Sequence, residues 1–539
     1  MYKPVVLIIL DGWGIAPAGP CNAISQAKTP NIDRFSKTFF STTLQASGEA
    51  VGLPKGEAGN TETGHINLGA GQIVYQDLAR INQAIADGSF SKNQALLQSV
   101  KHLEGFNSNL HIMGLVGAGG VHSSTQHLLA LLRFYKTHKI SRVFLHLFTD
   151  GRDSPPTSAL TFTARVENEI KKIQVGQIAT IMGRYYGMDR DLRWERTQKA
   201  YEALSLSKGT HASSTREAIS QAYNKKQTDE FIQPTIILDS KGNPLPRIKT
   251  NDAVVFFNFR IDRPRQLTKS FVIPDFNALL LPKTFDPYDI KYHGKHRPVK
   301  TPRQPFERAE KIKNLFFITM TEYEKGLPVT VAFPPKLVSN PLAKVLADNK
   351  LTQLHVSETE KERFITYYFN GLREDPVTGE DRMIIPSAKV PTYDQKPEMS
   401  AEEITRTLLE RTVAGSHNFI VVNFANADMV GHTGNIKTTI SACQVVDTAI
   451  GRVALNIIGQ GGAVLITSDH GNAEQMINRQ TGGVDTEHSL NPVPFIVVAN
   501  NLPAKPPVIH QGILADVAPT ILKLLGIPKP EEMTGKELI

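Results

Sequence analysis

Short apolar runs that end in Asp, Gly or Asn alternate along the chain with stretches of helical periodicity. The strand-like runs are VVLIILDG, SRVFLHLFTDG, DAVVFFNFR, FIVVNFAN and AVLITSDHG. Apolar residues recur at helical spacing in QHLLALLRFYKTH, AEEITRTLLERTVAG and SACQVVDTAIGRVALNIIG. Strands that are apolar at nearly every position are typical of parallel sheets covered on both faces. The alternation therefore predicts an α/β architecture with largely parallel sheets.

None of the apolar runs approaches the roughly 20 residues that a helix needs to cross a bilayer. The first one, VVLIIL, is shorter than a signal-peptide core and continues directly into Asp11. The chain has two cysteines, Cys21 and Cys443, which rules out a disulfide framework and disfavours a Cys-based metal site. We therefore expect a cytoplasmic protein that does not bind a membrane.

Length and charge add two expectations. A chain of 539 residues exceeds what one hydrophobic core usually holds, so we expect two domains. The net charge of +8 is compatible with binding either nucleic acid or a small anion. Many arginines lie in the compact motifs GRYYGMDRDLRWER and FFNFRIDRPR, not in basic stripes interleaved with stacking aromatic residues. A phosphorylated metabolite is therefore the preferred ligand.

The chemical motifs cluster at the two ends of the chain, with an arginine-rich segment between them, which predicts that one domain interrupts another. Candidate crossing points lie at residues 75–77 and at the Pro-rich residues 331–336. The prediction is one domain of residues 1–76 and 336–539 and an inserted domain of residues 77–335. Residues 282–313 are basic, rich in proline and without periodicity, so we expect a surface loop there.

Aspartates and histidines follow several of the predicted strands, at the edge where open α/β sheets collect ligands. Asp428 and His432 are four residues apart, so a helical turn would place both on one face. The candidate ligands are Asp11, Asp428, His432, Asp469, His470 and His488. Any one of them alone is more often a cap, turn or core residue. Together they suit manganese or zinc, and two such ions would clamp a phosphoryl group.

Two further groups of residues fit phosphoryl chemistry. Thr61 lies in the Gly-rich segment GNTETGHINLGAG, where a hydroxyl beside a metal and backbone donors would serve as a nucleophile. An ordinary turn or helix cap is the alternative for this residue. Guanidinium groups match phosphate and carboxylate oxygens, although salt bridges to nearby aspartates are the alternative role. The arginines that follow predicted strands are Arg152, Arg184, Arg190, Arg260 and Arg263.

Taken in order, the motifs resemble those of the 2,3-bisphosphoglycerate-independent phosphoglycerate mutases of the alkaline phosphatase superfamily. They are LDGWG, GNTETGHINLGAG, GGVHS, DGRDSPP, GRYYGMDRD, FFNFRIDR, VAFPP, ETEK, NFANADMVGHTG and SDHGNAE. The likeness covers nearly the whole chain and is more specific than any single motif. It implies an alkaline-phosphatase-like doubly wound sheet domain into which a second α/β transferase domain is inserted.

The resemblance also implies a role for each matching residue. One manganese ion would be held by Asp428, His432 and His488, and a second by Asp11, Thr61, Asp469 and His470. Cobalt and zinc share these ligands. The implied substrate-binding residues are His122, Arg152, Asp153, Arg184, Arg190, Arg260, Arg263 and Lys361. Thr61 would carry the phosphoryl group, Lys361 would screen its charge, and Asp153 would act as general base or acid.

The implied activity interconverts 3-phosphoglycerate and 2-phosphoglycerate through a phosphoenzyme, in a protein that we expect to be a monomer. The family motif has Ser where this chain has Thr61, a secondary alcohol with a stiffer χ1, so we expect an effect on rate or on the balance between mutase and hydrolase. The main alternative is a metal-dependent phosphatase or phosphodiesterase of the same superfamily. Retention of GGVHS, DGRD and GRYYGMDRD favours the mutase. A third possibility is a nucleic-acid-binding protein that uses residues 282–313.

Overall fold

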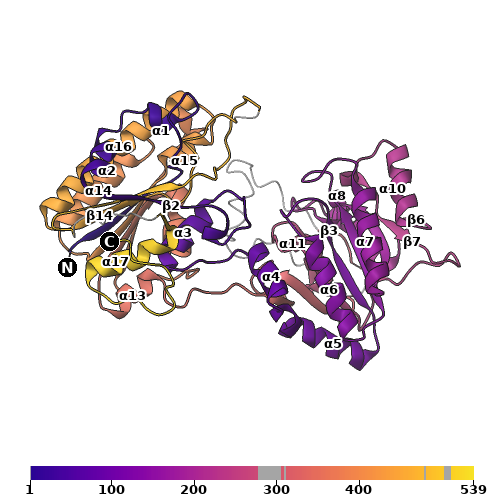
Figure 1. The fold of residues 1–539 in the computed structure, drawn as a ribbon. Helices are drawn as coiled ribbons and strands as arrows, with labels where there is room; N and C mark the ends of the chain where they lie inside the picture. The colour runs from indigo at the N-terminus through magenta and orange to yellow at the C-terminus, as the bar shows by residue number, and fades with distance from the viewer. Residues whose placement is uncertain (1, 277–304, 309–310, 479–480, 503–510) are drawn as a thin grey trace. The chain divides into compact units, whose positions relative to one another are not determined.

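A computed structural model describes residues 2–276, 305–308, 311–478, 481–502 and 511–539. Most of the segment 282–313 lies outside these residues. The chain divides into two compact units (Figure 1). Unit 1 comprises Met1–Gln76 and Lys336–Ile539, and unit 2 comprises Asp77–Pro335. Each unit has its own eight-stranded sheet, which confirms the predicted α/β class.

The sheet of unit 1 has the strand order β12-β11-β13-β1-β14-β15-β2-β16. The strands from β12 to β14 are parallel, whereas β15 runs antiparallel to both of its neighbours. In this order the strands are Glu380–Ile385, Gln353–Glu358, Phe419–Phe424, Val5–Leu10, Ala463–Thr467, Val493–Ala499, Phe40–Gln45 and Gly512–Ile513. The central strands thus agree with the prediction, and the antiparallel strand lies toward one side.

The apolar character of β1 follows from burial on both faces of the sheet. Val5 and Leu7 face one hydrophobic core, whereas Val6 and Ile8 face the other. Helices α2, α14 and α16 cover the second core, and α3, α13 and α17 cover the first (Figure 1). The helices of unit 1 are α1 (Ala23–Gln26), α2 (Pro30–Thr38), α3 (Thr61–Ala70), α13 (Leu342–Asp348), α14 (Ala401–Val413), α15 (Asn426–Gly431), α16 (Ile436–Gly459) and α17 (Val517–Leu525).

The sheet of unit 2 has the order β10-β9-β8-β3-β4-β5-β7-β6, parallel from β10 to β5 and with β7 antiparallel to β5. In this order the strands are Thr330–Phe333, Phe316–Thr321, Ala253–Phe256, Leu110–Val116, Val143–Thr149, Gln177–Gly183, Thr235–Ile237 and Thr210–Ala212. The two faces of β3 again enter different cores, because Ile112 packs into one and Met113 into the other.

Helices flank the sheet of unit 2 as well. They are α4 (Asp77–Ala86), α5 (Gln94–Phe106), α6 (Thr125–Thr137), α7 (Ala159–Ile173), α8 (Arg184–Gly187), α9 (Trp194–Leu206), α10 (Thr215–Asn224) and α11 (Pro264–Val272). The three predicted helical stretches correspond to α6, α14 and α16. Among the helices within the described ranges, none combines the length and apolar character required to span a bilayer.

Candidate active site

The candidate metal ligands of unit 1 follow neighbouring parallel strands. Asp11 comes directly after β1, Asp428 lies on α15 after β13, and Asp469 follows β14. Because β1 lies between β13 and β14 and is parallel to both, the carboxyl ends of these strands meet at one edge of the sheet. On the other side of β13, β11 leads into the short 3₁₀ helix η5 (Thr359–Lys361). The topology thus brings Lys361 to the same edge.

Asp428, His432 and His488 form a group of possible metal ligands that we call the first cluster. Oδ1 of Asp428 lies 3.2 Å from Nε2 of His432 and 3.4 Å from Nε2 of His488, and the two Nε2 atoms are 3.2 Å apart. Nδ1 of His432 lies 2.7 Å from the carbonyl oxygen of Thr486, and Nδ1 of His488 lies 2.9 Å from that of Gly59. A carbonyl oxygen only accepts hydrogen bonds, so both Nδ1 atoms carry a proton.

With Nδ1 protonated, the neutral rings present lone pairs at Nε2, and three acceptor atoms face one another in the first cluster. Such an arrangement is favourable only when a cation or an added proton lies among them. Burial lowers the pKa of His432 and His488, but the hydrogen bonds and charge of Asp428 outweigh it and raise both pKa values. A carboxylate with two imidazoles suits manganese, cobalt or zinc. The first cluster therefore fits a divalent cation.

Asp11, Asp469 and His470 form the second cluster and are fully buried. Nε2 of His470 lies 3.3 Å from Oδ2 of Asp469, 3.5 Å from Oδ1 of Asp11 and 3.0 Å from Oγ1 of Thr61. Oδ2 of Asp469 is buried and lies 3.3 Å from a ring nitrogen of His65 and 3.3 Å from one of His470, contacts long enough that a cation would satisfy this oxygen better. Burial and the charge of Asp469 raise the pKa of Asp11 to about 7. The second cluster thus also fits a cation.

Lys361 joins the two clusters. Its Nζ donates to Oδ1 of Asp11 and to Oδ2 of Asp428, both at 2.8 Å, and lies 3.4 Å from Oγ1 of Thr61. Burial lowers the pKa of Lys361, but the charges of Asp11 and Asp428 outweigh burial and raise it, so the ammonium stays charged. The carboxylates of Asp11, Asp428 and Asp469 therefore share one buried ammonium, and the remaining negative charge favours binding of further cations.

Thr61 is the first residue of α3, and local contacts fix its place. The Asn60 side chain accepts from the backbone N–H of Thr63 at 3.0 Å, and the Thr63 hydroxyl lies 3.3 Å from the Asn60 nitrogen, which forms a capping box. A Cβ atom at Gly64 would lie 2.5 Å from Cβ of Asp469, so only glycine allows α3 to approach this closely. The Thr61 hydroxyl thus lies at a helix N-terminus, which favours a phosphoryl group.

In unit 2 the candidate substrate-binding residues also follow adjacent parallel strands. Strands β8, β3, β4 and β5 are neighbours in that order, so their carboxyl ends share one edge of the sheet. Taken in strand order, the residues that follow them are Arg260 and Arg263, His122, Arg152 and Asp153, and Arg184. Residues from four separate segments thus converge because the sheet is parallel.

Arg184 is buried at the centre of this group. Its Nη1 donates to Oδ1 of Asp150 and to Oδ2 of Asp153, both at 2.6 Å, and its Nη2 donates to Nε2 of His122 at 2.9 Å. Burial and the charge of Arg184 lower the pKa of His122 to about 3, so the ring is neutral. Burial raises the pKa of Asp153, but Arg184 outweighs it, and the net shift is downward. Asp153 is therefore ionised at neutral pH.

Positive charge accumulates around Asp262. This carboxylate accepts a hydrogen bond from Arg190, and its Oδ1 lies 3.3 Å from Nε of Arg260. Burial and the charges of Arg184 and Arg190 lower the pKa of Arg263 to about 10. A guanidinium whose pKa is lowered by its neighbours lies in an environment that favours an anion.

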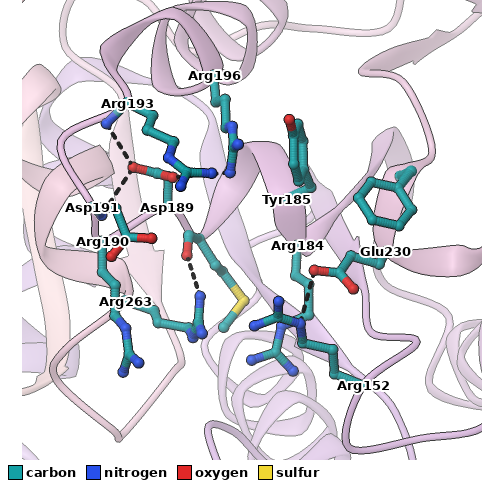
Figure 2. A pocket seen from close by; sticks show the side chains of 12 residues that line it. Arg152, Arg184, Tyr185, Asp189, Arg190, Asp191, Arg193, Arg196, Glu230 and Arg263 are labelled. Carbon is teal, nitrogen blue, oxygen red and sulfur yellow. Dashed lines mark hydrogen bonds and ion pairs between the residues drawn. The ribbon is translucent and has the colours of Figure 1, made fainter. Parts of the chain in front are cut away.

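A cavity of about 280 Å³ opens among these arginines in unit 2 (Figure 2). The candidate residues that line it are Arg152, Arg184, Arg190 and Arg263. Arg193 and Arg196, which the sequence analysis did not select, line it too, and the guanidinium of Arg196 lies 3.6 Å from the centre of the Tyr185 ring. Because arginines outnumber the acidic residues of the lining, the cavity suits a small anionic ligand.

The candidate metal ligands of unit 1 thus lie together in the two clusters. The candidate substrate-binding residues of unit 2 contact Arg184, line the cavity or pair with Asp262. The sequence analysis missed residues that support these groups, namely Asp150, His65, Asn423 and Glu474. Glu474 is buried and accepts from the backbone N–H of Gly14 at 3.0 Å and of Asn472 at 2.8 Å. Asn423 offered a signal, because it is the polar residue inside the apolar run FIVVNF.

Comparisons with known proteins agree on one family, and the relatives align over the full length of the chain. A family model described as the BPG-independent PGAM N-terminus matches residues 81–325. The 2,3-bisphosphoglycerate-independent phosphoglycerate mutase of Chloroflexus aggregans is 50% identical over 100% of this chain and 98% of its own length. That of Moorella thermoacetica is 48% identical, with the same shares covered. The structure of Leishmania mexicana phosphoglycerate mutase at low cobalt concentration superposes with a TM-score of 0.63 and 29% identity, covering 99% of this chain and 97% of that one. The chain therefore belongs to the family of 2,3-bisphosphoglycerate-independent phosphoglycerate mutases.

Proposed function

We propose that this protein interconverts 3-phosphoglycerate and 2-phosphoglycerate without 2,3-bisphosphoglycerate. Its family relatives are named for this activity and align with it from end to end. The observation that carries the proposal is the position of Thr61. Its Oγ1 lies 3.0 Å from Nε2 of His470 and 3.4 Å from Nζ of Lys361, beside two groups of candidate metal ligands.

The donor atoms support two divalent cations, and we assign manganese, with cobalt or zinc as substitutes. The Leishmania mexicana relative was solved in the presence of cobalt, which agrees with this chemistry. Asp428, His432 and His488 would hold one ion, and Asp11, Asp469, His470 and Thr61 the other. When bound, such ions would neutralise phosphoryl oxygens and lower the pKa of a nearby hydroxyl.

In unit 1 Thr61 acts as the nucleophile. Its Oγ1 gives up its proton and bonds to phosphorus while the bond between phosphorus and the glycerate oxygen breaks. That oxygen takes up a proton, which leaves a phosphothreonine and bound glycerate. Attack of the other glycerate hydroxyl on the same phosphorus then breaks the bond between phosphorus and Oγ1, so that Thr61 recovers its proton and the phosphoryl group returns to glycerate at the new position. The ammonium of Lys361 screens the negative charge that develops on the phosphoryl oxygens.

In unit 2 the arginines bind the carboxylate of the glycerate portion, and Asp153 transfers protons to and from its hydroxyl oxygens. The carboxylate of Asp153 is ionised because Arg184 lies 2.6 Å away, so it can accept the proton of the attacking glycerate hydroxyl. In the first half of the reaction the glycerate oxygen that leaves phosphorus takes up the proton that Thr61 has given up, with Asp153 as the group that passes it on. Arg184 holds Asp153 and His122 in fixed positions for this task.

The test is an assay of the purified full-length protein with 3-phosphoglycerate, with and without added Mn²⁺. We expect 2-phosphoglycerate to form in a manganese-dependent manner and free phosphate to form far more slowly. Release of phosphate in place of 2-phosphoglycerate would instead identify a phosphatase on the same scaffold. The absence of turnover with Mn²⁺, Co²⁺ and Zn²⁺ alike would contradict the proposal.

A further inference from the structure

Two buried polar residues, Asn423 on β13 and His65 on α3, lie directly behind the second cluster. Nδ2 of Asn423 donates to Oδ2 of Asp11 at 2.8 Å and lies 3.0 Å from Nε2 of His65. Nδ1 of His65 lies 2.9 Å from the carbonyl oxygen of Thr61 and 3.3 Å from Oδ2 of Asp469. The pair therefore contacts two ligands of this cluster and the backbone of the candidate nucleophile.

The partners determine which atom carries each proton. A carboxylate that faces a cation is ionised and only accepts, so the side-chain atom of Asn423 nearest Asp11 is the amide nitrogen. The same amide nitrogen can only donate to His65, which makes Nε2 of that ring the acceptor and places the ring proton on Nδ1. The Nδ1–H group then points toward the Thr61 carbonyl and toward Asp469. Asn423 thus orients the ring of His65 and the carboxylate of Asp11, and the ring of His65 in turn orients Asp469.

The contacts of this pair are selective for the second cluster. Among the described contacts, neither His65 nor Asn423 reaches Asp428, His432 or His488. The carboxylate of Asp428 is instead held by Lys361 and by Asn472, whose Nδ2 lies 3.3 Å from its Oδ1. Any effect of the pair on cation binding should therefore appear at one site and not at the other.

We propose that His65 and Asn423 are positioning residues that set the geometry and the affinity of the second cation site. They act through Asp11 and Asp469 and do not touch the substrate. Groups that orient metal ligands from behind typically change metal affinity by about 10- to 100-fold when they are replaced. The inference rests on the proposed function, which assigns a cation to the second cluster.

The experiment titrates Mn²⁺ into full-length protein freed of metal by a chelator, with binding followed by calorimetry and stoichiometry by native mass spectrometry. The variants are Asn423→Leu, which keeps the branching of the side chain and removes its N–H donors, and His65→Gln, whose amide cannot reproduce the contacts of both ring nitrogens at once. We expect the wild type to bind two ions, and each variant to bind one normally and the other about 10- to 100-fold more weakly.

A matched control is His355→Gln. His355 is a buried histidine of unit 1 with both ring nitrogens bonded, to the carbonyl of Ile365 at 2.8 Å and to Gln353 at 3.1 Å. It belongs to neither cluster, so its variant should bind both ions as the wild type does. Asn423→Ala serves as the second variant at that position if the leucine prevents folding, as judged by circular dichroism.

The identity of the weakened site follows from a double variant. In His65→Gln with His432→Ala both sites should be impaired, so no ion should bind with the wild-type affinity. Retention of one normal site in this double variant, or of two normal sites in the folded single variants, would overturn the inference. An equal loss in His355→Gln would overturn it too, because the effect would then come from the fold. A wild type that binds no ion would overturn the proposed function, and this inference with it.

Discussion

Replacing Lys361 with methionine should destabilise the metal-free protein and leave it more dependent on divalent cations. The substitution removes the ammonium that lies 2.8 Å from both Asp11 and Asp428. The two buried carboxylates of Asp11 and Asp428 would then face each other without the lysine ammonium between them. Because bound Mn²⁺ would supply that positive charge, the gain in the free energy of unfolding on adding Mn²⁺ should be larger in Lys361→Met than in the wild type.

The magnitude follows from burial. Removing one partner of a buried ion pair typically costs about 3–5 kcal/mol. Burial and Asp469 already raise the pKa of Asp11 to about 7. In the variant this carboxyl can therefore take up a proton, which reduces the loss in the free energy of unfolding. We therefore expect a loss near the lower end, about 3 kcal/mol at pH 7. In the variant the folded state binds more protons than the unfolded state, so stability should fall further as the pH rises from 7 to 8.

Urea unfolding in the presence of a chelator measures this loss. Trp13 is buried in unit 1 beside the second cluster, with its backbone N–H donating to Ser468 at 3.0 Å. The chain has two tryptophans, so a Trp194→Phe background leaves Trp13 as the fluorescent reporter of unit 1. The control is Lys344→Met, because Lys344 pairs with Asp348 in solvent and such pairs contribute at most about 1 kcal/mol.

The reasoning would be refuted if Lys361→Met lost no more stability than Lys344→Met. It would also be refuted if Mn²⁺ stabilised the wild type and Lys361→Met equally. Either result would mean that the carboxylates of Asp11 and Asp428 do not depend on a shared cation.

Three further expectations concern the chemistry. In the assay with 3-phosphoglycerate, Thr61→Ala should abolish turnover in a folded protein, whereas Thr61→Ser should retain it. A folded but inactive Thr61→Ser would show that the site requires threonine. Asp153→Asn should lower kcat by about 100- to 10,000-fold with its fold unchanged, because it removes the general base; near-normal kcat would exclude that role. The pKa values of His432 and His488 are raised, so protons compete with the metal, and Mn²⁺ affinity should fall by up to about tenfold per pH unit for each displaced proton as the pH drops from 8 to 6. Calorimetry at several pH values, in buffers of different ionisation enthalpy, checks the last expectation, and a pH-independent affinity would contradict it.

Strands β1, β13 and β14 of unit 1 and β4 and β8 of unit 2 could be predicted because burial on both faces leaves a continuous apolar run, whereas β3, which is also buried, is not among the predicted runs. The run VVLIIL is β1, and Asp11, directly after it, could be placed at the functional edge by the general behaviour of parallel sheets. Strand direction could not be read in the same way. β15 is as apolar as β1 but runs antiparallel to β14, since burial and not direction determines the composition. β2 is rich in Ser and Thr and gave no signal.

Candidate residues could be selected from the sequence because their residue types suit metal or phosphate chemistry, whereas the supporting residues in the same motifs do not show in the sequence which groups they contact. Asn423 and Asp11 are 412 residues apart in the chain, and their hydrogen bond arises only because β1 and β13 are paired. His65 lies four residues after Thr61 in a Gly-rich helix and looks like an ordinary polar residue until Asp469 is packed against it. Such contacts are products of tertiary structure.

The central claim is that two divalent cations lie beside Thr61. Anomalous X-ray diffraction from crystals grown with Mn²⁺ tests it most directly. The account predicts two anomalous peaks, one bounded by Asp428, His432 and His488 and the other by Asp11, Asp469 and His470. Crystals that show no anomalous peak at either cluster, or manganese bound only elsewhere on the protein, would contradict it.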